Sequence, residues 1–322
     1  MKVAILYGEV SKEAREDEKD VLVEVEAVSK SLYNLGYDPV ALPLSMNIKK
    51  TIDKLKQCGY LFVFNLIESI EGKDQFIHIA PTVLDSLKIP YTGSKSDAIY
   101  ITTNKLLAKK LLKASHIPTP FSFTAENFLN NNIRSKGPWI IKSIWEHASI
   151  GLDENSVFFK KDLLKKEIKK RFSEGERNYF VEDYIDGREF NISLLAGKDG
   201  PEVLPHAEIK FVDYNEKIKV VGYRAKWDES SFEYHHTIRS FDFPEEDSLL
   251  LDKLTKISKD CWDLFDLKGY GRVDFRVDLK GNPWVLEVNI NPCLSPDSGF
   301  IAATVKAGLS YEEVIKRIIG ER

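Results

Sequence analysis

Two runs of alternating apolar and polar residues, separated by a short polar turn, limit most strongly how this chain can fold. The first run covers residues 271–278, the second covers residues 284–289, and the turn between them contains Gly281. Alternation with a period of two is typical of strands that bury one face, and a glycine turn between two such runs predicts a β-hairpin.

The register expected for this hairpin collects its apolar side chains on one face. If Lys280 and Gly281 form the centre of the turn, three apolar pairs face each other across the strands. A slip by one residue would mix polar and apolar side chains on both faces, so the pattern itself favours this register. The expected pairs are Val273 with Val288, Phe275 with Leu286, and Val277 with Trp284.

The same register places two carboxylates opposite each other on the polar face. Asp274 would face Glu287, and Arg272 would face Asn289. Facing acids repel each other, so we expect a positive group between them. Oxygen ligands without histidine or cysteine suit a hard cation such as Mg²⁺. Considered alone, the hairpin is equally consistent with an acidic face in contact with water.

The order of apolar segments predicts three structural units. Residues 1–94 alternate short apolar runs with helical patterns, which is typical of a parallel sheet covered by helices. A lysine-rich helix over 103–115 is expected to begin the second unit, and a strand over 203–211 lies in the third. The expected domains are 1–94, 95–187 and 188–322.

Composition excludes several classes of protein. The 322 residues carry 50 acids against 46 bases, which gives no support to a nucleic-acid-binding surface. The longest apolar run, residues 60–64, is far shorter than the roughly 20 residues that span a membrane. The N-terminal residues do not resemble a signal peptide, and the three cysteines lie far apart. We therefore expect a cytoplasmic protein that binds neither nucleic acid nor membrane.

Charged side chains in the central unit and at the start of the third unit could bind a phosphorylated ligand. Lys142 shares a strand face with Ile140 and Ile144, where its charge is costly unless it meets an anion. The carboxylates of Glu182 and Glu189 could accept hydrogen bonds from an adenine amino group and ribose hydroxyls. Each feature has an ordinary alternative, because exposed acids and lysines are common.

Taken in order, these segments resemble the ATP-grasp superfamily, and most closely its D-alanine:D-alanine ligase branch of carboxylate–amine ligases. This resemblance implies an α/β and α+β chain, in which an N-terminal βαβ (Rossmann-like) domain precedes the ATP-grasp fold. It also favours the metal interpretation of the hairpin over the solvated one. The matching segments, which span nearly the whole chain, are 89–94, 104–105, 117–120, 141–151, 181–190, 225–226, 271–275 and 286–298.

The resemblance implies a role for each of thirteen residues. Three lysines would contact the ATP phosphates under a flap, while carboxylates and backbone groups would hold adenine and ribose. Two Mg²⁺ ions, with Mn²⁺ as the alternative, would be held by three oxygen ligands. In that order the residues are Lys105, Lys142 and Lys226 for phosphates, Ser149 for the flap, Glu182, Tyr184 and Ile185 for adenine, Glu189 for ribose, Asp274, Glu287 and Asn289 for metal, Arg272 for the oxyanion, and Ser298 for a substrate carboxylate.

The amino-acid pocket departs from the D-alanine pattern. The first loop, residues 8–15, lacks the glycine pair of that branch. Glu68 lies near the place of a histidine, and Cys293 replaces a glycine. Trp227 replaces a tyrosine and Ala148 a serine. We therefore expect substrates other than D-alanine.

The resulting hypothesis is an ATP- and Mg²⁺-dependent ligase that joins a carboxylate to an amine through an acyl phosphate. Its expected partners are ATP and small amino-acid or amine substrates, and a homodimer is implied by the branch. A true D-alanine:D-alanine ligase is the first alternative. A regulatory protein that binds ATP without ligating is the second, although an oxyanion arginine at position 272 argues against it.

Overall fold

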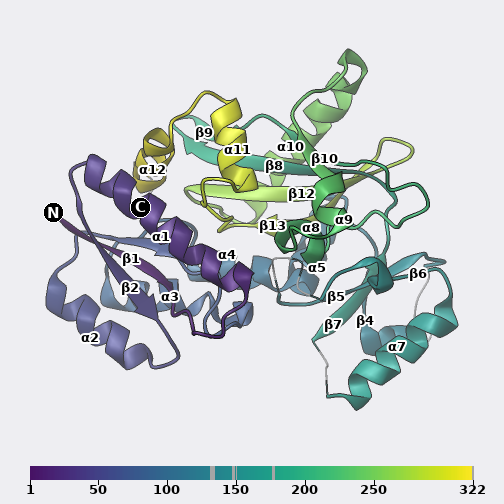
Figure 1. Cartoon of the computed structure of the whole chain (residues 1–322), viewed down its shortest axis with the longest axis horizontal. Helices are drawn as coiled ribbons and strands as arrows, with labels where there is room; N and C mark the ends of the chain where they lie inside the picture. The colour runs from purple at the N-terminus through teal and green to yellow at the C-terminus, as the bar shows by residue number, and fades with distance from the viewer. Residues whose placement is uncertain (131–134, 147–148, 150, 176–177, 321–322) are drawn as a thin grey trace.

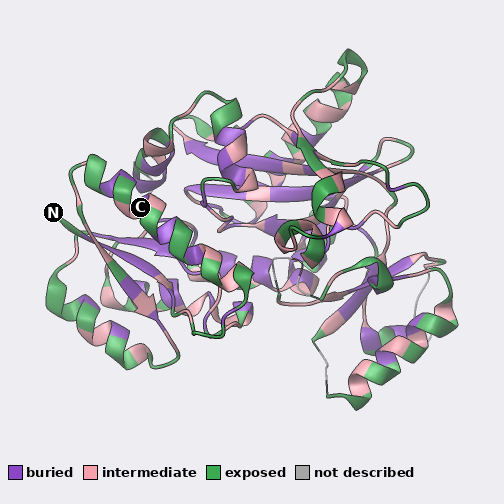
Figure 2. Cartoon of the chain, viewed as in Figure 1, coloured by how far each residue is buried: buried purple, intermediate pink, exposed green. Residues whose placement is uncertain are grey.

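The structure is a computed structural model that describes residues 1–130, 135–146, 149, 151–175 and 178–320. The described residues form three β-sheets, each carried by its own lobe of the molecule (Figure 1). Buried residues follow the strands of all three sheets, whereas α2 and α7 turn exposed faces outward (Figure 2).

The N-terminal sheet is parallel, as the alternation of strands and helices predicted. Its strand order is β2-β1-β3, and Tyr91 adds a single parallel bridge beside Val63. The third strand of this sheet begins at Val63. In chain order the elements are β1 (Lys2–Gly8), α1 (Glu16–Asn34), β2 (Asp38–Leu44), α2 (Ile48–Cys58), β3 (Val63–Leu66), a short 3-10 helix (Asp74–Phe76) and α3 (Ile79–Leu87).

Two helices separated by one residue connect the first sheet to the second. They are α4 (Ser96–Thr103) and α5 (Lys105–Ala114). The sequence predicted only the second, and its expected start at Thr103 belongs to α4. The break lies at Asn104, whose backbone is extended (ψ 91°) and whose side chain accepts a hydrogen bond from the Leu107 N–H. This N-cap begins α5 at Lys105.

The central sheet is antiparallel and packs two helices on one face. Its strand order is β4-β7-β5-β6. Alternate residues of β5 divide between the faces, so that Ile141 packs with Leu164 and Val181 while Ile140 and Lys142 face the other way, toward a cavity. The elements are β4 (Ser122–Thr124), α6 (Ala125–Leu129), β5 (Trp139–Ser143), a 3-10 helix (Glu154–Ser156), β6 (Val157–Phe158), α7 (Lys161–Ser173) and β7 (Tyr179–Asp183).

The third sheet has six antiparallel strands and contains the predicted hairpin. Its order is β11-β10-β8-β12-β13, and β9 pairs with β8. The elements are β8 (Gly187–Gly197), β9 (Gly200–Val203), β10 (Ala207–Phe211), α8 (Tyr223–Trp227), α9 (Phe232–His236), β11 (Thr237–Ser240), a 3-10 helix (Glu245–Asp247), α10 (Ser248–Leu264), β12 (Tyr270–Asp278), β13 (Pro283–Asn289), α11 (Gly299–Lys306) and α12 (Tyr311–Gly320).

The single strand expected over 203–211 is wrong. The segment divides into the end of β9 and the separate strand β10, with residues 204–206 between them. Pro205 lies in this gap and has no N–H to donate to a neighbouring strand, which explains the interruption.

The hairpin register is correct near the site and wrong near the turn. Arg272 pairs with Asn289, Val273 with Val288 and Asp274 with Glu287, as expected. Beyond Asp274 the register shifts by one residue, so the expected pairs of Phe275 with Leu286 and Val277 with Trp284 do not form. The shift is a β-bulge, which leaves one extra residue in β13.

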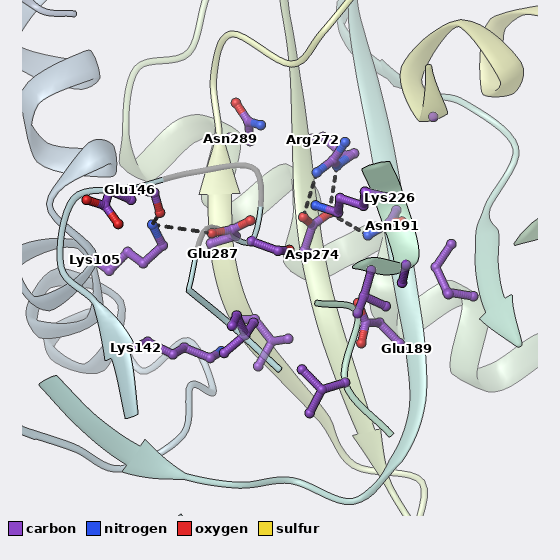
Figure 3. A pocket seen from close by; sticks show the side chains of 18 of the residues that line it. Lys105, Lys142, Glu146, Glu189, Asn191, Lys226, Arg272, Asp274, Glu287 and Asn289 are labelled. Carbon is purple, nitrogen blue, oxygen red and sulfur yellow. Dashed lines mark hydrogen bonds and ion pairs between the residues drawn. The ribbon is translucent and has the colours of Figure 1, made fainter. Parts of the chain in front are cut away.

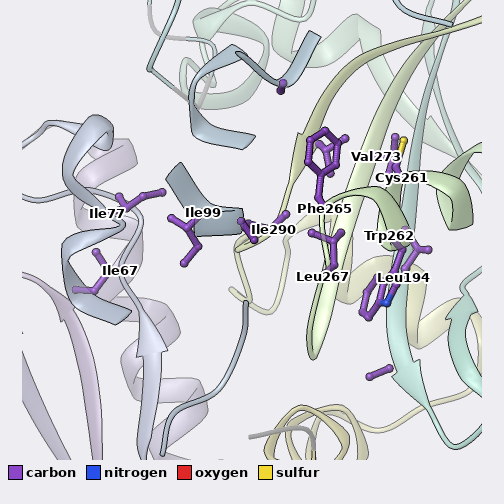
Figure 4. Close-up of a cluster of buried hydrophobic side chains, with 14 of the residues drawn as sticks. Ile67, Ile77, Ile99, Leu194, Cys261, Trp262, Phe265, Leu267, Val273 and Ile290 are labelled. Atoms are coloured by element: carbon purple, nitrogen blue, oxygen red, sulfur yellow. The ribbon is translucent and has the colours of Figure 1, made fainter. Parts of the chain in front are cut away.

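Two apolar cores connect the lobes. One extends from Ile67 and Ile77 of the N-terminal lobe through Ile99 and Ile290 to Trp262 on α10 (Figure 4). In the other core, β1 and α1 pack against α11 and α12. Its buried side chains include Ile5, Val28, Phe300, Val314 and Ile315. These shared cores join the N-terminal sheet to the third sheet, whereas the central sheet packs on an apolar core of its own.

No described helix is both long enough and apolar enough to cross a membrane. The domain boundaries expected from the sequence, and the homodimer, stay predictions.

Candidate active site

A cavity of about 500 Å³ lies where the central and third sheets face each other. Its walls come from β5 and β7 on one side, from β8, β12 and β13 on the other, and from α1 and loops of the N-terminal lobe. All thirteen site residues expected from the sequence line it, including Ser298, which also caps α11. Figure 3 labels eight of them, together with the neighbouring side chains of Glu146 and Asn191.

Arg272 and Asp274 form a tight ion pair on β12. Residues two apart in a strand project to the same face, and here Nε and Nη2 of Arg272 donate to the two carboxylate oxygens at 2.8 Å each. Asn191 on β8 donates to Asp274 Oδ1 at 2.7 Å. Burial alone would lower the pKa of Arg272, but Asp274 outweighs it and the pKa is raised. The guanidinium therefore keeps its charge in the cavity wall.

The side chains of Glu287 and Lys105 lie close together in the cavity, next to Asp274. Glu287 faces Asp274 across the hairpin, and its Oε2 lies 3.8 Å from Lys105 Nζ (Figure 3). Lys105 Nζ also donates to the Glu146 carbonyl oxygen at 2.5 Å. Burial lowers the pKa of Lys105, an effect that Glu287 opposes.

The polar face of the hairpin fits a hard cation. Asp274, Glu287 and Asn289 present carboxylate and amide oxygens from adjacent strand positions toward one cavity. Asn289 Oδ1 accepts the Asn291 N–H at 3.2 Å, which orients its oxygen. Such an oxygen set is the kind that Mg²⁺ prefers.

A buried carboxylate is shared by two lysines at the opposite wall. Glu182 on β7 is 1% exposed, and its two oxygens lie 2.7 Å from Lys109 Nζ and 2.6 Å from Lys142 Nζ. Burial would raise the pKa of Glu182, but the two lysines lower it. Lys109 was not expected from the sequence. Its signal was available, because it follows Lys105 by four residues and so shares a helix face with it.

The remaining polar residues surround the outer part of the cavity. Burial raises the pKa of Glu189, although Arg276 Nη2 lies 2.9 Å from its carboxylate and opposes the shift. Burial and then Arg272 lower the pKa of Lys226 on α8. The Tyr184 hydroxyl donates to the Lys219 carbonyl oxygen at 3.0 Å.

The β-bulge brings Leu286 into the cavity. Val285 is buried in the core, whereas Leu286 and Glu287 are both half-buried and line the cavity despite being consecutive. Leu286 therefore joins Ile140 as part of an apolar wall. The sequence had placed it on the core face because alternation alone does not reveal a bulge.

Part of the expected flap lies outside the described residues, including His147 and Ala148. Ser149 is described and lines the cavity. His235 and His236, which the sequence analysis did not assign to the site, belong to α9, and His236 stacks on Phe232 with ring centroids 3.8 Å apart.

Comparison with known proteins matches this geometry to one family. The family model described as D-ala D-ala ligase C-terminus matches residues 121–320. The D-alanine–D-alanine ligase of Carboxydothermus hydrogenoformans is 32% identical over 99% of this chain and 97% of its own length. The chain belongs to the D-alanine–D-alanine ligase family.

Two further comparisons describe the range of this ATP-grasp family. The uncharacterized protein y4sG of Sinorhizobium fredii is 31% identical over 80% of this chain and 73% of its own. The crystal structure of D-alanine–D-alanine ligase from Bacillus anthracis superposes with a TM-score of 0.77 at 26% identity, covering 100% of this chain and 97% of that one. The predicted fold class is therefore confirmed. The named ligases of the family are ATP-dependent C–N ligases, and this chain is a ligase of that type.

The end of the cavity that the N-terminal lobe forms contains acidic residues. The resemblance to D-alanine–D-alanine ligases implied no role for them. Asp17, Asp20 and Glu68 line it together with Cys293. Cys293 Sγ donates to Asp20 Oδ2 at 3.0 Å. Sequence alone placed Glu68 and Cys293 near the amino-acid pocket, but gave no signal that Asp20 on α1 would meet them.

Proposed function

We propose that this chain is an ATP- and Mg²⁺-dependent carboxylate–amine ligase that works through an acyl phosphate and has an altered amino-acid pocket. The observation that carries the proposal is the gathering of Arg272, Asp274, Glu287 and Asn289 with three lysines around one cavity. A protein that only binds nucleotide has no need of a charged arginine held beside the metal-type ligands.

Each group of residues in the cavity would have its own role in phosphoryl transfer. Lys105, Lys142 and Lys226 would neutralise the ATP phosphates, because the reaction depends mainly on positioning and charge stabilisation. A substrate carboxylate oxygen forms a bond to the γ-phosphorus while the bond to the bridging oxygen breaks and ADP leaves. Mg²⁺ held by Asp274, Glu287 and Asn289 would supply further positive charge to the phosphates.

The second step would form the C–N bond. The amine nitrogen attacks the acyl carbon, inorganic phosphate leaves with the electron pair of the C–O bond, and the nitrogen loses a proton. Arg272 would stabilise the oxyanion of the tetrahedral intermediate, since its guanidinium is buried and charged. Leu286 and Ile140 would contact the flat adenine ring, while Glu189 would accept hydrogen bonds from ribose.

The altered pocket is supported by the residues at the N-terminal end of the cavity. Glu68 and Cys293 stand where the family pattern has a histidine and a glycine, and both line the cavity beside Asp20. A thiol and additional carboxylates change both the volume and the charge that a substrate meets.

Phosphate release from ATP tests the proposal. The protein is incubated with ATP and Mg²⁺, first with D-alanine alone and then with single amino acids, pairs of amino acids, and amines. Release that requires a substrate other than D-alanine, together with a product containing a new amide, is expected. Asp274→Asn is the negative control, because it removes a carboxylate charge from the metal ligands while keeping the side-chain shape.

Two results would redirect the assignment. A strong response to D-alanine alone would identify a true D-alanine–D-alanine ligase, which the similarity to the C. hydrogenoformans enzyme favours. ATP binding without phosphate release across the whole set would instead indicate a non-ligating ATP-binding regulator.

A further inference from the structure

Lys109 on α5 is a buried cation beside the cavity that the proposed reaction does not use. Its side chain is 2% exposed and does not line the cavity, whereas that of Lys142 is 17% exposed and does (Figure 3). The two ammonium groups lie on either side of one carboxylate. Lys109 Nζ is 2.7 Å from Glu182 Oε2, and Lys142 Nζ is 2.6 Å from Glu182 Oε1. We call these three residues the Glu182 cluster.

The ammonium group of Lys109 is fixed from a second direction by the loop that follows α5. Its Nζ donates to Thr119 Oγ1 at 3.1 Å, and that hydroxyl donates to the Val285 carbonyl oxygen at 2.8 Å. The Val285 N–H in turn donates to the Pro118 carbonyl oxygen at 2.8 Å, so the loop is bound to β13. Because Thr119 has one hydroxyl proton and donates it to Val285, its oxygen is left to accept from Lys109.

The Glu182 cluster has one positive charge in excess. Burial would raise the pKa of Glu182, but Lys109 and Lys142 lower it, so the carboxylate is ionised. Burial lowers the pKa of Lys109, an effect that Glu182 opposes. With both lysines protonated, one positive charge balances the carboxylate and the other remains. Only Lys142 lines the cavity, so the remaining charge is presented to a ligand there.

Stability alone gives little reason to bury such a cluster. Removing charges from water costs free energy that their attraction often only balances, and apolar side chains of similar volume frequently replace a buried ion pair without loss. Ile140, which faces Glu182 across the sheet, shows that this wall accepts apolar side chains. The charges of the cluster are therefore better explained by the ligand that enters the cavity.

We propose that Lys109 is a positioning residue that neutralises Glu182 and so leaves the charge of Lys142 available to the ATP phosphates. Without Lys109, Glu182 and Lys142 would form a neutral pair, and the phosphates would meet one positive charge less. Glu182 can still accept a hydrogen bond from the adenine amino group, because a carboxylate has about four acceptor positions. The inference rests on the proposed function, because it requires ATP phosphates beside Lys142.

Calorimetry with a non-hydrolysable ATP analogue and with adenosine, both in the presence of Mg²⁺, tests this role. The ratio of the two association constants measures what the phosphates contribute, because both ligands contain the same nucleoside. Lys109→Met should lower this ratio about tenfold, while the affinity for adenosine stays within about twofold. Lys110→Met is the matched control, since Lys110 is exposed on the same helix and should leave the ratio unchanged.

Changing Glu182 should have the opposite effect on the ratio. Glu182→Gln removes the carboxylate that neutralises a lysine, so adenosine should bind more weakly while the ratio does not fall. In the double variant Lys109→Met with Glu182→Gln, Lys142 is the one charge left in the cluster, and the ratio should return to within about twofold of the unmodified protein.

Two results would overturn the inference. If Lys109 has only a structural role, Lys109→Met weakens both ligands together and leaves the ratio unchanged. A ratio that is about tenfold lower in the double variant would also contradict charge balancing, because no carboxylate then opposes Lys142. The double variant removes the whole ion pair and leaves no buried charge unpaired at position 109 or 182, so it gives this answer also where Lys109→Met alone does not fold.

Phosphate release separates this inference from the proposed function. The expected ratios without phosphate release for any substrate would support the role of Lys109 and contradict the ligase proposal. Substrate-dependent phosphate release, with the same ratio in Lys109→Met as in the unmodified protein, would do the reverse. Failure of the unmodified protein to bind the ATP analogue would overturn both.

Discussion

Arg272 places a positive charge in the cavity wall and is held by Asp274 on its own strand. Its guanidinium holds both oxygens of Asp274, and Asn191 fixes one of them from the neighbouring strand. The arrangement positions a proposed metal ligand and a proposed oxyanion donor with the same pair of hydrogen bonds. Changing Arg272 should therefore affect the chemical step more than the binding of nucleotide.

Replacing Arg272 by alanine should lower kcat by about 10²–10³-fold, the usual loss when one oxyanion donor is removed, with a much smaller change in ATP affinity. Arg272→Lys should recover only part of the rate, because lysine keeps the charge but not the paired geometry. Single-turnover phosphate release, with ATP affinity measured separately by calorimetry, checks both. Single-turnover rates equal to those of the unmodified protein would contradict the assigned role.

Glu24 should make stability depend on pH. Burial raises its pKa from 4.5 to about 8, so the native protein retains a proton that the unfolded chain releases at lower pH. The free energy of unfolding should then fall as pH rises between these values, because the native state binds more protons there. Urea denaturation at about pH 5.5 and about pH 8 should show a smaller fall for Glu24→Gln than for Glu26→Gln, which changes an exposed acid on the same helix. Identical pH dependence in the two variants would argue that Glu24 ionises normally.

At the scale of elements, the β-bulge in β13 determines which of its side chains line the cavity. Without it, Leu286 would face the core opposite Phe275. With it, the consecutive residues Leu286 and Glu287 both face the cavity, and Val285 takes the core position. An apolar side chain and a proposed metal ligand are thus adjacent in sequence and in the site.

Alanine substitutions on either side of the bulge should have different consequences. Val285→Ala should destabilise the protein by about 2 kcal/mol, because Val285 is fully buried and its removal leaves a cavity. Leu286→Ala should cost less stability but weaken ATP binding several-fold by removing part of the apolar wall. Urea denaturation and calorimetry with ATP measure the two effects. The opposite assignment of losses would indicate a regular hairpin.

The elements that sequence could predict are those whose pattern is local. Alternation identified β12, β13 and the three pairs nearest the site, whereas the thirteen cavity residues were implied by the resemblance to the ATP-grasp superfamily. Strand β2 was not predicted, because Pro39 and Pro43 are unusual in strands. It is an edge strand, where a missing N–H is tolerated on the unpaired side.

The contacts that could not be predicted depend on how distant strands align. Asn191 meets Asp274 only because β8 pairs with β12 in one register, and Arg276 reaches Glu189 through the same pairing. Asp20 and Glu24 reach Cys293 because α1 lies against the loop after β13. Local periodicity contains no information on such alignments, which are set by the packing of the whole chain.

At the scale of the molecule, one apolar core contains residues of β1 and α1 together with residues of α11 and α12. Ile5 and Val28 pack in the same cluster as Val314 and Ile315, so β1 and α1 depend on α12 for part of their buried surface. Asp20 and Glu24 lie on α1, and their positions therefore depend on a contact made by α12.

Removing side-chain volume from α12 should loosen α1 as well. Ile315→Ala should lower the free energy of unfolding by about 2–5 kcal/mol, since the side chain is fully buried. Amide hydrogen exchange should increase in α1 and α12 together. Val305→Ala on α11 is the control, because Val305 is 65% exposed and should change little. Faster exchange confined to α12 would contradict a shared core.

This shared core also affects how the protein is made. During translation, β1 and α1 leave the ribosome before α11 and α12 have been synthesised. Until then, the apolar face of the N-terminal lobe that these helices cover is exposed to water. Chains that stop early would expose that face permanently and would be substrates for chaperones and proteases. Synthesis therefore has to reach the final helices before the first sheet of the protein is protected from water.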